Sequence, residues 1–172
     1  LTIFDEKVRA HLPPASTGTH FRTLAETLEQ TEPRGQTKLG DVLLNIGPQI
    51  RRRGIVFVVS DFVDEIEALT LGLGQFAFTG QDVVLVHIED PAERDFPFSG
   101  QTIFLGPENE GKLLCEPSDL RAIYLEERAS HLDALRNAAR RFGYHVEEIC
   151  TAAPLDEALA AFLAMRAGAP AR

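Results

Sequence analysis

The chain has 172 residues, of which 44% are hydrophobic and 25% are charged, and its formal net charge at pH 7 is -9. This length and hydrophobic content suffice to bury one core, so we expect a single domain over residues 1–167 and a flexible tail at 168–172. The acidic excess disfavours nucleic acid and anionic membranes as partners. The sequence has no run of about 18 apolar residues, so we expect no membrane insertion by this segment. The two cysteines lack metal-type spacing, which favours unpaired thiols in a reducing compartment, the cytoplasm.

The first third of the chain predicts a hairpin followed by two helices. Short apolar runs at 1–4 and 8–12 flank a charged turn and predict the hairpin. Helical spacing of apolar residues then predicts one helix capped by Thr19 and a second that starts near Thr37. Arg51, Arg52 and Arg53 end the second predicted helix, where cations complement its carbonyl end, and we favour this interpretation over a binding patch.

The run from Gly54 to Val59 is uncharged and rich in β-branched and aromatic side chains. It predicts a strand that is covered on both faces, as in a parallel sheet. Ser60 and Asp61 follow at once, at the carboxyl end of that strand. Ligands of open α/β sheets bind at this edge. A hydroxyl and a carboxylate there can coordinate a hard cation or begin the next helix.

The remaining two thirds alternate between helical and strand patterns. Helices are predicted from Ile66, after Pro117 with Ser118 as the cap, and from Pro154 with Leu155, Leu159, Phe162 and Leu163 on the apolar face. Strands are predicted at 82–88 and 145–149, a polar loop at 89–100, and a second hairpin at 102–105 and 112–115. This alternation favours a mostly parallel sheet with helices on both sides.

Several of these segments, in this order, resemble a von Willebrand factor A-like domain, and more narrowly the bacterial family called domain of unknown function 58. The matching stretches are Leu1-Thr2-Ile3-Phe4-Asp5, Gly35-Gln36-Thr37-Lys38-Leu39-Gly40, Arg52 through Phe62, Asp82 through Glu93, Asp95 through Phe98, and Thr151 with Pro154-Leu155. The resemblance implies a three-layer α/β/α fold with a mostly parallel sheet. It begins at the family's second strand, so the first strand is missing. Its absence would leave unpaired strand edges at 1–4 and 55–60. Either these two strands pair directly with each other or another chain fills the gap, and a homo-oligomer is one form of the second outcome.

The resemblance also implies a metal-ion-dependent adhesion site. Thr37 matches the family's threonine position, Asp61 matches its last aspartate, and Ser60 is a weaker third ligand. The family's Asp-x-Ser-x-Ser motif has no counterpart in this sequence, so the site is incomplete and we expect no cofactor in this chain. In a longer protein Mg²⁺ or Mn²⁺ would bind there, with a partner's carboxylate in the open position. The residues alone, without the resemblance, favour Thr37 as a helix cap and Asp61 as a cap or hydrogen-bond acceptor over metal ligation.

From this resemblance we expect a non-enzymatic protein-interaction or adaptor domain that works with a MoxR-type AAA+ ATPase. Asp64, His87, Asp90 and Glu93 are the expected partner-binding residues. One rival is a small metal-dependent hydrolase or phosphotransfer enzyme that uses Asp61 and the loop from His87 to Asp95; another is a structural fragment without metal. The sequence has no nucleophile elbow, phosphate loop or dinucleotide fingerprint, which weakly disfavours an enzyme.

Overall fold

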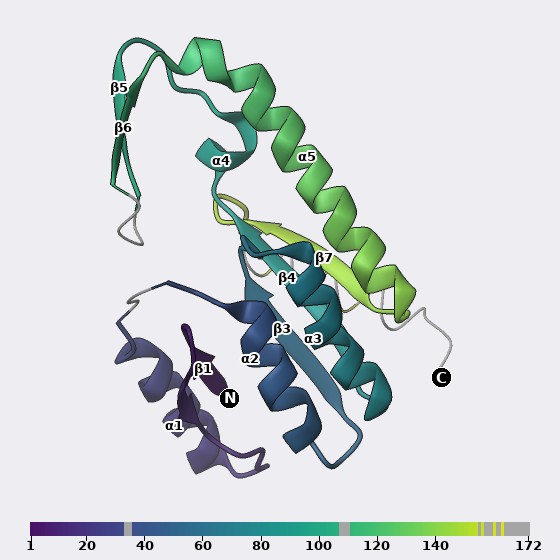
Figure 1. Ribbon diagram of the computed structural model, residues 1–172. Coiled ribbons are helices and arrows are strands. Elements are labelled where there is room, and N and C mark those ends of the chain that lie inside the picture. Colours follow the sequence, from purple (N-terminus) through teal and green to yellow (C-terminus); the bar gives the residue numbers. More distant parts are fainter. Residues whose placement is uncertain (33–35, 107–110, 155, 157–159, 161–162, 164–172) are drawn as a thin grey trace.

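The computed structural model describes residues 1–172 except 33–35, 107–110, 155, 157–159, 161–162 and 164–172. At its centre three parallel strands pair in the order β3-β4-β7 (Figure 1). They are β3 (Ile55–Ser60), β4 (Asp82–Glu89) and β7 (His145–Cys150). The register places Ser60 opposite His87 and Glu89 opposite Cys150. The predicted α/β class with a parallel sheet is therefore confirmed.

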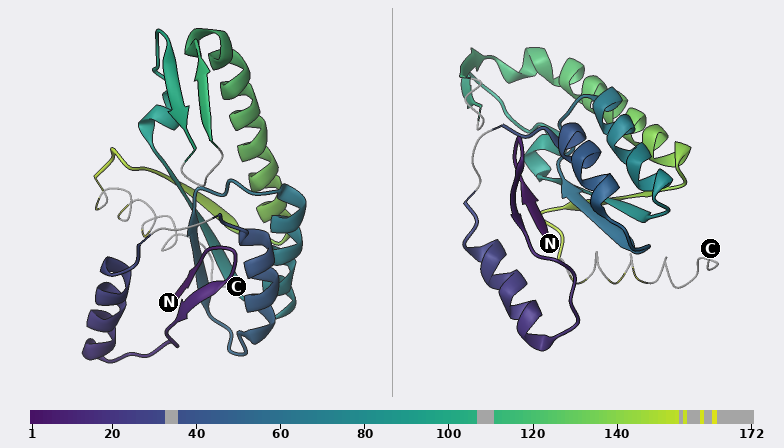
Figure 2. Two further views of the ribbon diagram at one scale, coloured as in Figure 1. Left: turned by 60° about the vertical axis from the view of Figure 1, so that its left-hand side comes forward. Right: turned by 60° about the horizontal axis from the view of Figure 1, so that its bottom comes forward.

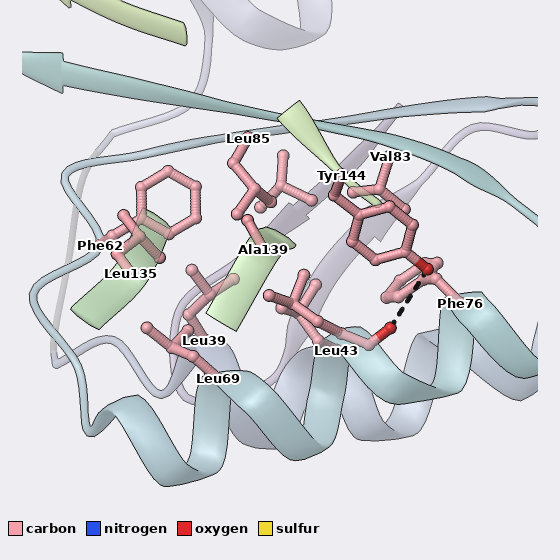
Figure 3. Close-up of a cluster of buried hydrophobic side chains, with 12 residues drawn as sticks. Leu39, Leu43, Phe62, Leu69, Phe76, Val83, Leu85, Leu135, Ala139 and Tyr144 are labelled. Atoms are coloured by element: carbon pink, nitrogen blue, oxygen red, sulfur yellow. Dashed lines mark hydrogen bonds between the residues drawn. The ribbon is translucent and has the colours of Figure 1, made fainter. Parts of the chain in front are cut away.

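Three helices cover one face of this sheet (Figure 2). They are α2 (Leu39–Ile46), which continues into a 3-10 turn at Gly47–Gln49, α3 (Ile66–Phe78) and α5 (Pro117–Arg141). Alternate strand residues point into the space beneath them, and Leu39, Leu69, Leu73, Phe76, Val83, Leu85 and Leu135 are buried there (Figure 3). The Tyr144 hydroxyl donates to the Leu73 carbonyl oxygen at 3.4 Å, which links the start of β7 to α3.

Glycine sets the distance between α2 and α3. A Cβ on Gly40 would lie 2.6 Å from two atoms of Ala68, and a Cβ on Gly72 would lie 2.7 Å from the Leu43 Cβ. Real side chains do not approach so closely, so the two helices pack through the hydrogen atoms of these glycines. This contact fixes where α2 begins, and therefore where the loop before it lies.

The predicted N-terminal hairpin is confirmed, and it forms a sheet of its own. β1 (Thr2–Phe4) pairs antiparallel with β2 (Val8–His11), and α1 (Gly18–Glu29) follows. The Asp5 carbonyl oxygen accepts from the Lys38 backbone N–H at 3.4 Å, which ties the hairpin turn to the entry of α2. Within the part of the chain that the structure describes, β1 does not pair with β3, so the two edges have not closed up.

The second hairpin is also confirmed, and with the first half of α5 it extends beyond the sheet (Figure 1). β5 (Thr102–Leu105) pairs antiparallel with β6 (Lys112–Cys115). Its inner face packs through Phe104 onto Phe96 and Phe98, with ring centroids 5.7 and 5.1 Å away. The Arg121 guanidinium donates to the carbonyl oxygens of Phe96 and Phe98 at 2.9 and 2.7 Å, which joins this loop to α5.

Three predicted helix starts are wrong by one or two residues. The α1 cap is Thr17, whose hydroxyl accepts from the His20 N–H, and not Thr19. α2 has Lys38 at its cap position and α5 has Glu116, and neither side chain makes a capping bond. Several serines and threonines lie near each start, and the sequence does not indicate which of them has extended backbone.

Three further predictions are corrected. The 3-10 turn ends at Gln49, so Arg51–Arg53 lie in the loop before β3 and not in a helix. The loop predicted at 89–100 contains a short helix, α4 (Pro91–Asp95). The outward side chains of β3 are only partly buried: Ile55 is 54% exposed, and Phe57 and Val59 are similarly exposed. An uncharged run therefore marks a strand here without marking two buried faces.

Most of the helix predicted after Pro154, and the predicted tail at 168–172, fall outside the described residues. Cys115 and Cys150 are unpaired and half-buried. None of the helices in the described ranges combines the length and the apolar character that crossing a membrane requires.

Candidate functional site

The candidate site lies at the carboxyl end of β3, where the chain turns from Ser60 into α3. The Ser60 hydroxyl donates to the Asp61 Oδ1 at 3.3 Å and accepts from the Phe62 N–H at 3.0 Å. The Asp61 Oδ1 also accepts from the Val63 N–H at 3.3 Å. Asp61 nevertheless remains exposed. The turn therefore holds a solvent-facing carboxylate in a defined orientation.

Asp64 connects this turn to the start of α2. Its Oδ2 accepts from the Gly40 N–H at 2.9 Å, and its Oδ1 accepts from the Glu65 N–H at 2.7 Å. Gly40 is three residues after Thr37, which is half-buried. The bond to Gly40 therefore connects the first turn of α2, which follows the loop of Thr37, to the turn that carries Asp61. Asp64, expected to bind a partner, supports its own fold with both carboxylate oxygens.

Phe62 anchors the turn from below. Its φ angle is 55°, in the left-handed region that residues other than glycine rarely adopt. Its ring is 1% exposed and packs in the core beside Leu135 (Figure 3). Its carbonyl oxygen accepts from the His131 Nε2 at 2.8 Å. Burial of the ring offsets the backbone strain, and the imidazole fixes the turn against α5.

Beneath the turn, β4 presents buried polar side chains to α5. The Glu89 carboxylate pairs with the Arg128 guanidinium, and their side chains are 8% and 22% exposed. His87 is 6% exposed, and its Nδ1 has no hydrogen-bond partner. Burial lowers the pKa of His87, although the negative charges of Glu89, Glu148 and Asp61 act in the opposite direction. The lowered pKa favours the neutral form of the imidazole at neutral pH, and the ring is largely enclosed by the protein.

Asp90 and Glu93, the other two expected partner-binding residues, form a capping box at the start of α4. The Asp90 Oδ1 accepts from the Ala92 N–H at 2.8 Å, and the Glu93 Oε2 accepts from the Asp90 N–H at 3.2 Å. The Thr151 hydroxyl, just after β7, donates to the other oxygen of Asp90 at 3.3 Å. Both side chains lie at the same edge as Asp61 but serve local structure.

The oxygen groups at this edge do not make a complete magnesium site. Mg²⁺ takes near-octahedral oxygen ligation, usually through one or two carboxylates with waters and partner groups. Ser60 and Asp61 supply one hydroxyl and one carboxylate, to which the Thr37 loop adds one more hydroxyl. Among the residues that the structure describes, no cluster of three histidine, cysteine or acidic side chains has the arrangement of a metal site.

Sequence reasoning did not find the contacts from α5 that hold the edge. The bond from His131 to the Phe62 carbonyl oxygen depends on the φ angle of Phe62, which the sequence does not indicate. The Glu89–Arg128 pair links residues 39 apart in the chain. A signal for this pair was available in Glu89, which ends a largely apolar strand, because a buried acidic residue needs a cationic partner.

Comparison with models of known protein families shows which family the chain belongs to. A family model described as "Protein of unknown function DUF58" matches residues 1–134. The chain belongs to the DUF58 family. The DUF58 match covers both loops of the edge and ends within α5. Neither the curated proteins nor the solved structures contain a match to this chain.

Proposed function

We propose that this DUF58 chain is a non-enzymatic protein-interaction domain that recognises its partner through the carboxyl edge of the sheet. The observation that carries the proposal is the bond from the Gly40 N–H to Asp64, because it joins the Thr37 loop to the Asp61 turn. The Asp61 carboxylate stays exposed on that fixed turn. An exposed acid on a preorganised loop suits recognition of a cationic or hydrogen-bond-donating side chain of a partner.

The position of His87 favours binding over catalysis. A hydrolase of the kind considered above needs a general acid or base within hydrogen-bond reach of its substrate. His87 is buried beneath the edge, and its ring centroid lies 6.4 Å from that of Phe62. Glu89 is paired with Arg128. In this arrangement Asp61 has no exposed histidine from β4 beside it.

The resemblance to von Willebrand factor A-like domains extends the proposal to a partner. In that reading Asp61 occupies the last aspartate position of an adhesion site whose first strand is missing, and the adaptor works with a MoxR-type AAA+ ATPase. The oxygen ligands in the described part of the chain do not complete a magnesium site. We therefore assign recognition of the partner to the Asp61 carboxylate itself, without a metal ion. Mg²⁺ or Mn²⁺ would contribute only where a longer chain supplies further carboxylates.

The test is direct binding of the chain to a purified MoxR-type ATPase, measured by calorimetry. We expect Asp61→Ala to weaken binding about tenfold or more, equivalent to about 1.4 kcal/mol. Asp119→Ala is the matched control, because Asp119 is an exposed aspartate in the first turn of α5. Equal loss in both variants, or none in Asp61→Ala, would contradict the proposal. Hydrolysis of a phosphate ester by the wild-type chain that Asp61→Ala abolishes would replace it with the enzymatic alternative.

A further inference from the structure

An open groove of about 710 Å³ lies between α3 and the end of α5. Its lining includes Leu71, Gly74 and Phe78 of α3, with Arg141 and Phe142 from the end of α5. We call it the α3/α5 groove. α3 begins beside the Asp61 turn and runs back toward the start of the strands, where the Gly80 carbonyl oxygen accepts from the Arg53 Nε at 3.1 Å. The end of α3, which carries Phe78, is therefore at the opposite end of the sheet from the carboxyl ends of the strands (Figure 1).

The α3 wall presents large apolar side chains to solvent. Phe78 is 93% exposed and Leu71 is 63% exposed. They are seven residues apart, so they lie two turns apart on one face of the helix. Gly74 lies between them on the same face, and a Cβ there would be 3.6 Å from the Phe142 ring. A gap between two apolar residues, with an aromatic ring behind it, is the shape that accepts an apolar side chain from another helix.

The charge around the groove differs at its two ends. Arg140 and Arg141, in the last turn of α5, are exposed, and Arg141 lines the groove. Glu67, one turn before Leu71 on α3, is exposed at the other end. In a chain of formal net charge -9, a cationic rim beside exposed apolar side chains is a local exception. It is complementary to an occupant that carries both apolar and acidic residues.

We propose that the α3/α5 groove binds an acidic amphipathic helix of a partner protein. An apolar side chain of that helix fits between Leu71 and Phe78, over Gly74, and its carboxylates pair with Arg141. This is a second binding surface, separate from the Asp61 edge and independent of the function proposed for it. Two surfaces at opposite ends of one sheet allow a single domain to hold two proteins at once, which an adaptor requires.

Two synthetic peptides of about 18 residues, or five helical turns, test the proposal. Both have leucines at helical spacing; one has glutamates at its polar positions, and its twin has lysines there. With the whole 172-residue chain, fluorescence anisotropy should show saturable binding of the acidic peptide and binding of the twin at least about tenfold weaker. Phe78→Ser should weaken binding of the acidic peptide at least about tenfold. Arg141→Glu should reverse the preference, so that the lysine peptide binds more tightly than the glutamate peptide.

Phe78 is almost wholly exposed, so Phe78→Ser removes a contact without opening a cavity. Phe21→Ser is the matched control, because Phe21 is 75% exposed on α1, and it should leave peptide binding unchanged. Equal binding of both twins, or no effect of Phe78→Ser, would overturn the proposal. Light scattering that shows a dimer of the chain, lost in Phe78→Ser, would also overturn it, because a second copy would then cover the groove.

The two proposals fail separately. Asp61→Ala should leave peptide binding unchanged, since Asp61 lies at the other end of the sheet. A negative peptide result therefore removes only the α3/α5 groove and leaves the calorimetric test of Asp61 intact.

Discussion

Asp64 makes the hydrogen bond that brings the two loops of the carboxyl edge together, and it accepts from two backbone N–H groups. Asp64→Ala leaves the Gly40 N–H without its partner, and we expect the free energy of unfolding to fall by about 1–2 kcal/mol in urea titrations. Asp64→Asn keeps one acceptor oxygen and should lose less. If Asp64→Ala were as stable as the wild type, this bond would not be what holds the loops together.

His87 gives the chain a pH dependence of known sign. Burial lowers the pKa of its imidazole below the ordinary value of 6.5. Between the two pKa values the unfolded chain therefore binds a proton at this histidine and the folded chain does not. The free energy of unfolding should therefore fall as the pH is lowered through 6.5 toward the folded pKa.

The variant His87→Leu isolates this contribution. It removes the titrating group and also the Nδ1 that has no partner. Its free energy of unfolding should change less than that of the wild type between about pH 7.5 and 5.5, a range in which histidine is the side chain that ordinarily titrates. The same change in both proteins would show that His87 is not the source.

At the scale of elements, the contact between α2 and α3 depends on glycine. Gly40→Ala places a Cβ 2.6 Å from Ala68, so one helix must move, and we expect a loss of about 1–3 kcal/mol in the free energy of unfolding. Gly18→Ala is the control in α1, where nothing lies within 4 Å of the added Cβ. The control should be neutral or up to about 1 kcal/mol more stable. A neutral Gly40→Ala would mean that the helices do not pack this closely.

The Glu89–Arg128 pair attaches the long helix α5 to the sheet near the edge. Glu89→Ala leaves the largely buried Arg128 without its counter-charge, and we expect a loss of about 3 kcal/mol in the free energy of unfolding. The double variant Glu89→Leu/Arg128→Leu removes both charges and should recover most of that loss in the same urea titration. If the double variant were no better than Glu89→Ala, lost packing rather than an unpaired charge would be the cause.

Strands and hairpins were predictable from the sequence because their signals are local. The uncharged runs of β3 and β4 and the short strands of both hairpins are each recognisable within about ten residues, and the structure confirms these strands. The caps of α1, α2 and α5 were not predicted correctly, because a cap depends on the backbone angles of one residue among several similar ones. α4 was missed because five residues are too few for a helical period to be visible.

At the scale of the whole molecule, the sequence indicated where the candidate site lies but not what holds it. That Ser60 and Asp61 lie at the carboxyl edge follows from the topology of a parallel sheet alone. The bonds from Asp64 to α2 and from His131 to the turn join distant parts of the chain, so they required the packed helices. The α3/α5 groove was equally hidden, because the pattern of α3 indicates its buried face and not the exposed Phe78.

A protein partner is proposed to bind at the edge formed by the Asp61 turn and the Thr37 loop. Hydrogen exchange of the chain with and without a bound MoxR-type ATPase tests it most directly, because the measurement locates the contact along the sequence. We expect protection on binding to be largest at residues 60–64 and 36–40. Protection confined to other segments, with the exchange of both loops unchanged in a formed complex, would contradict it.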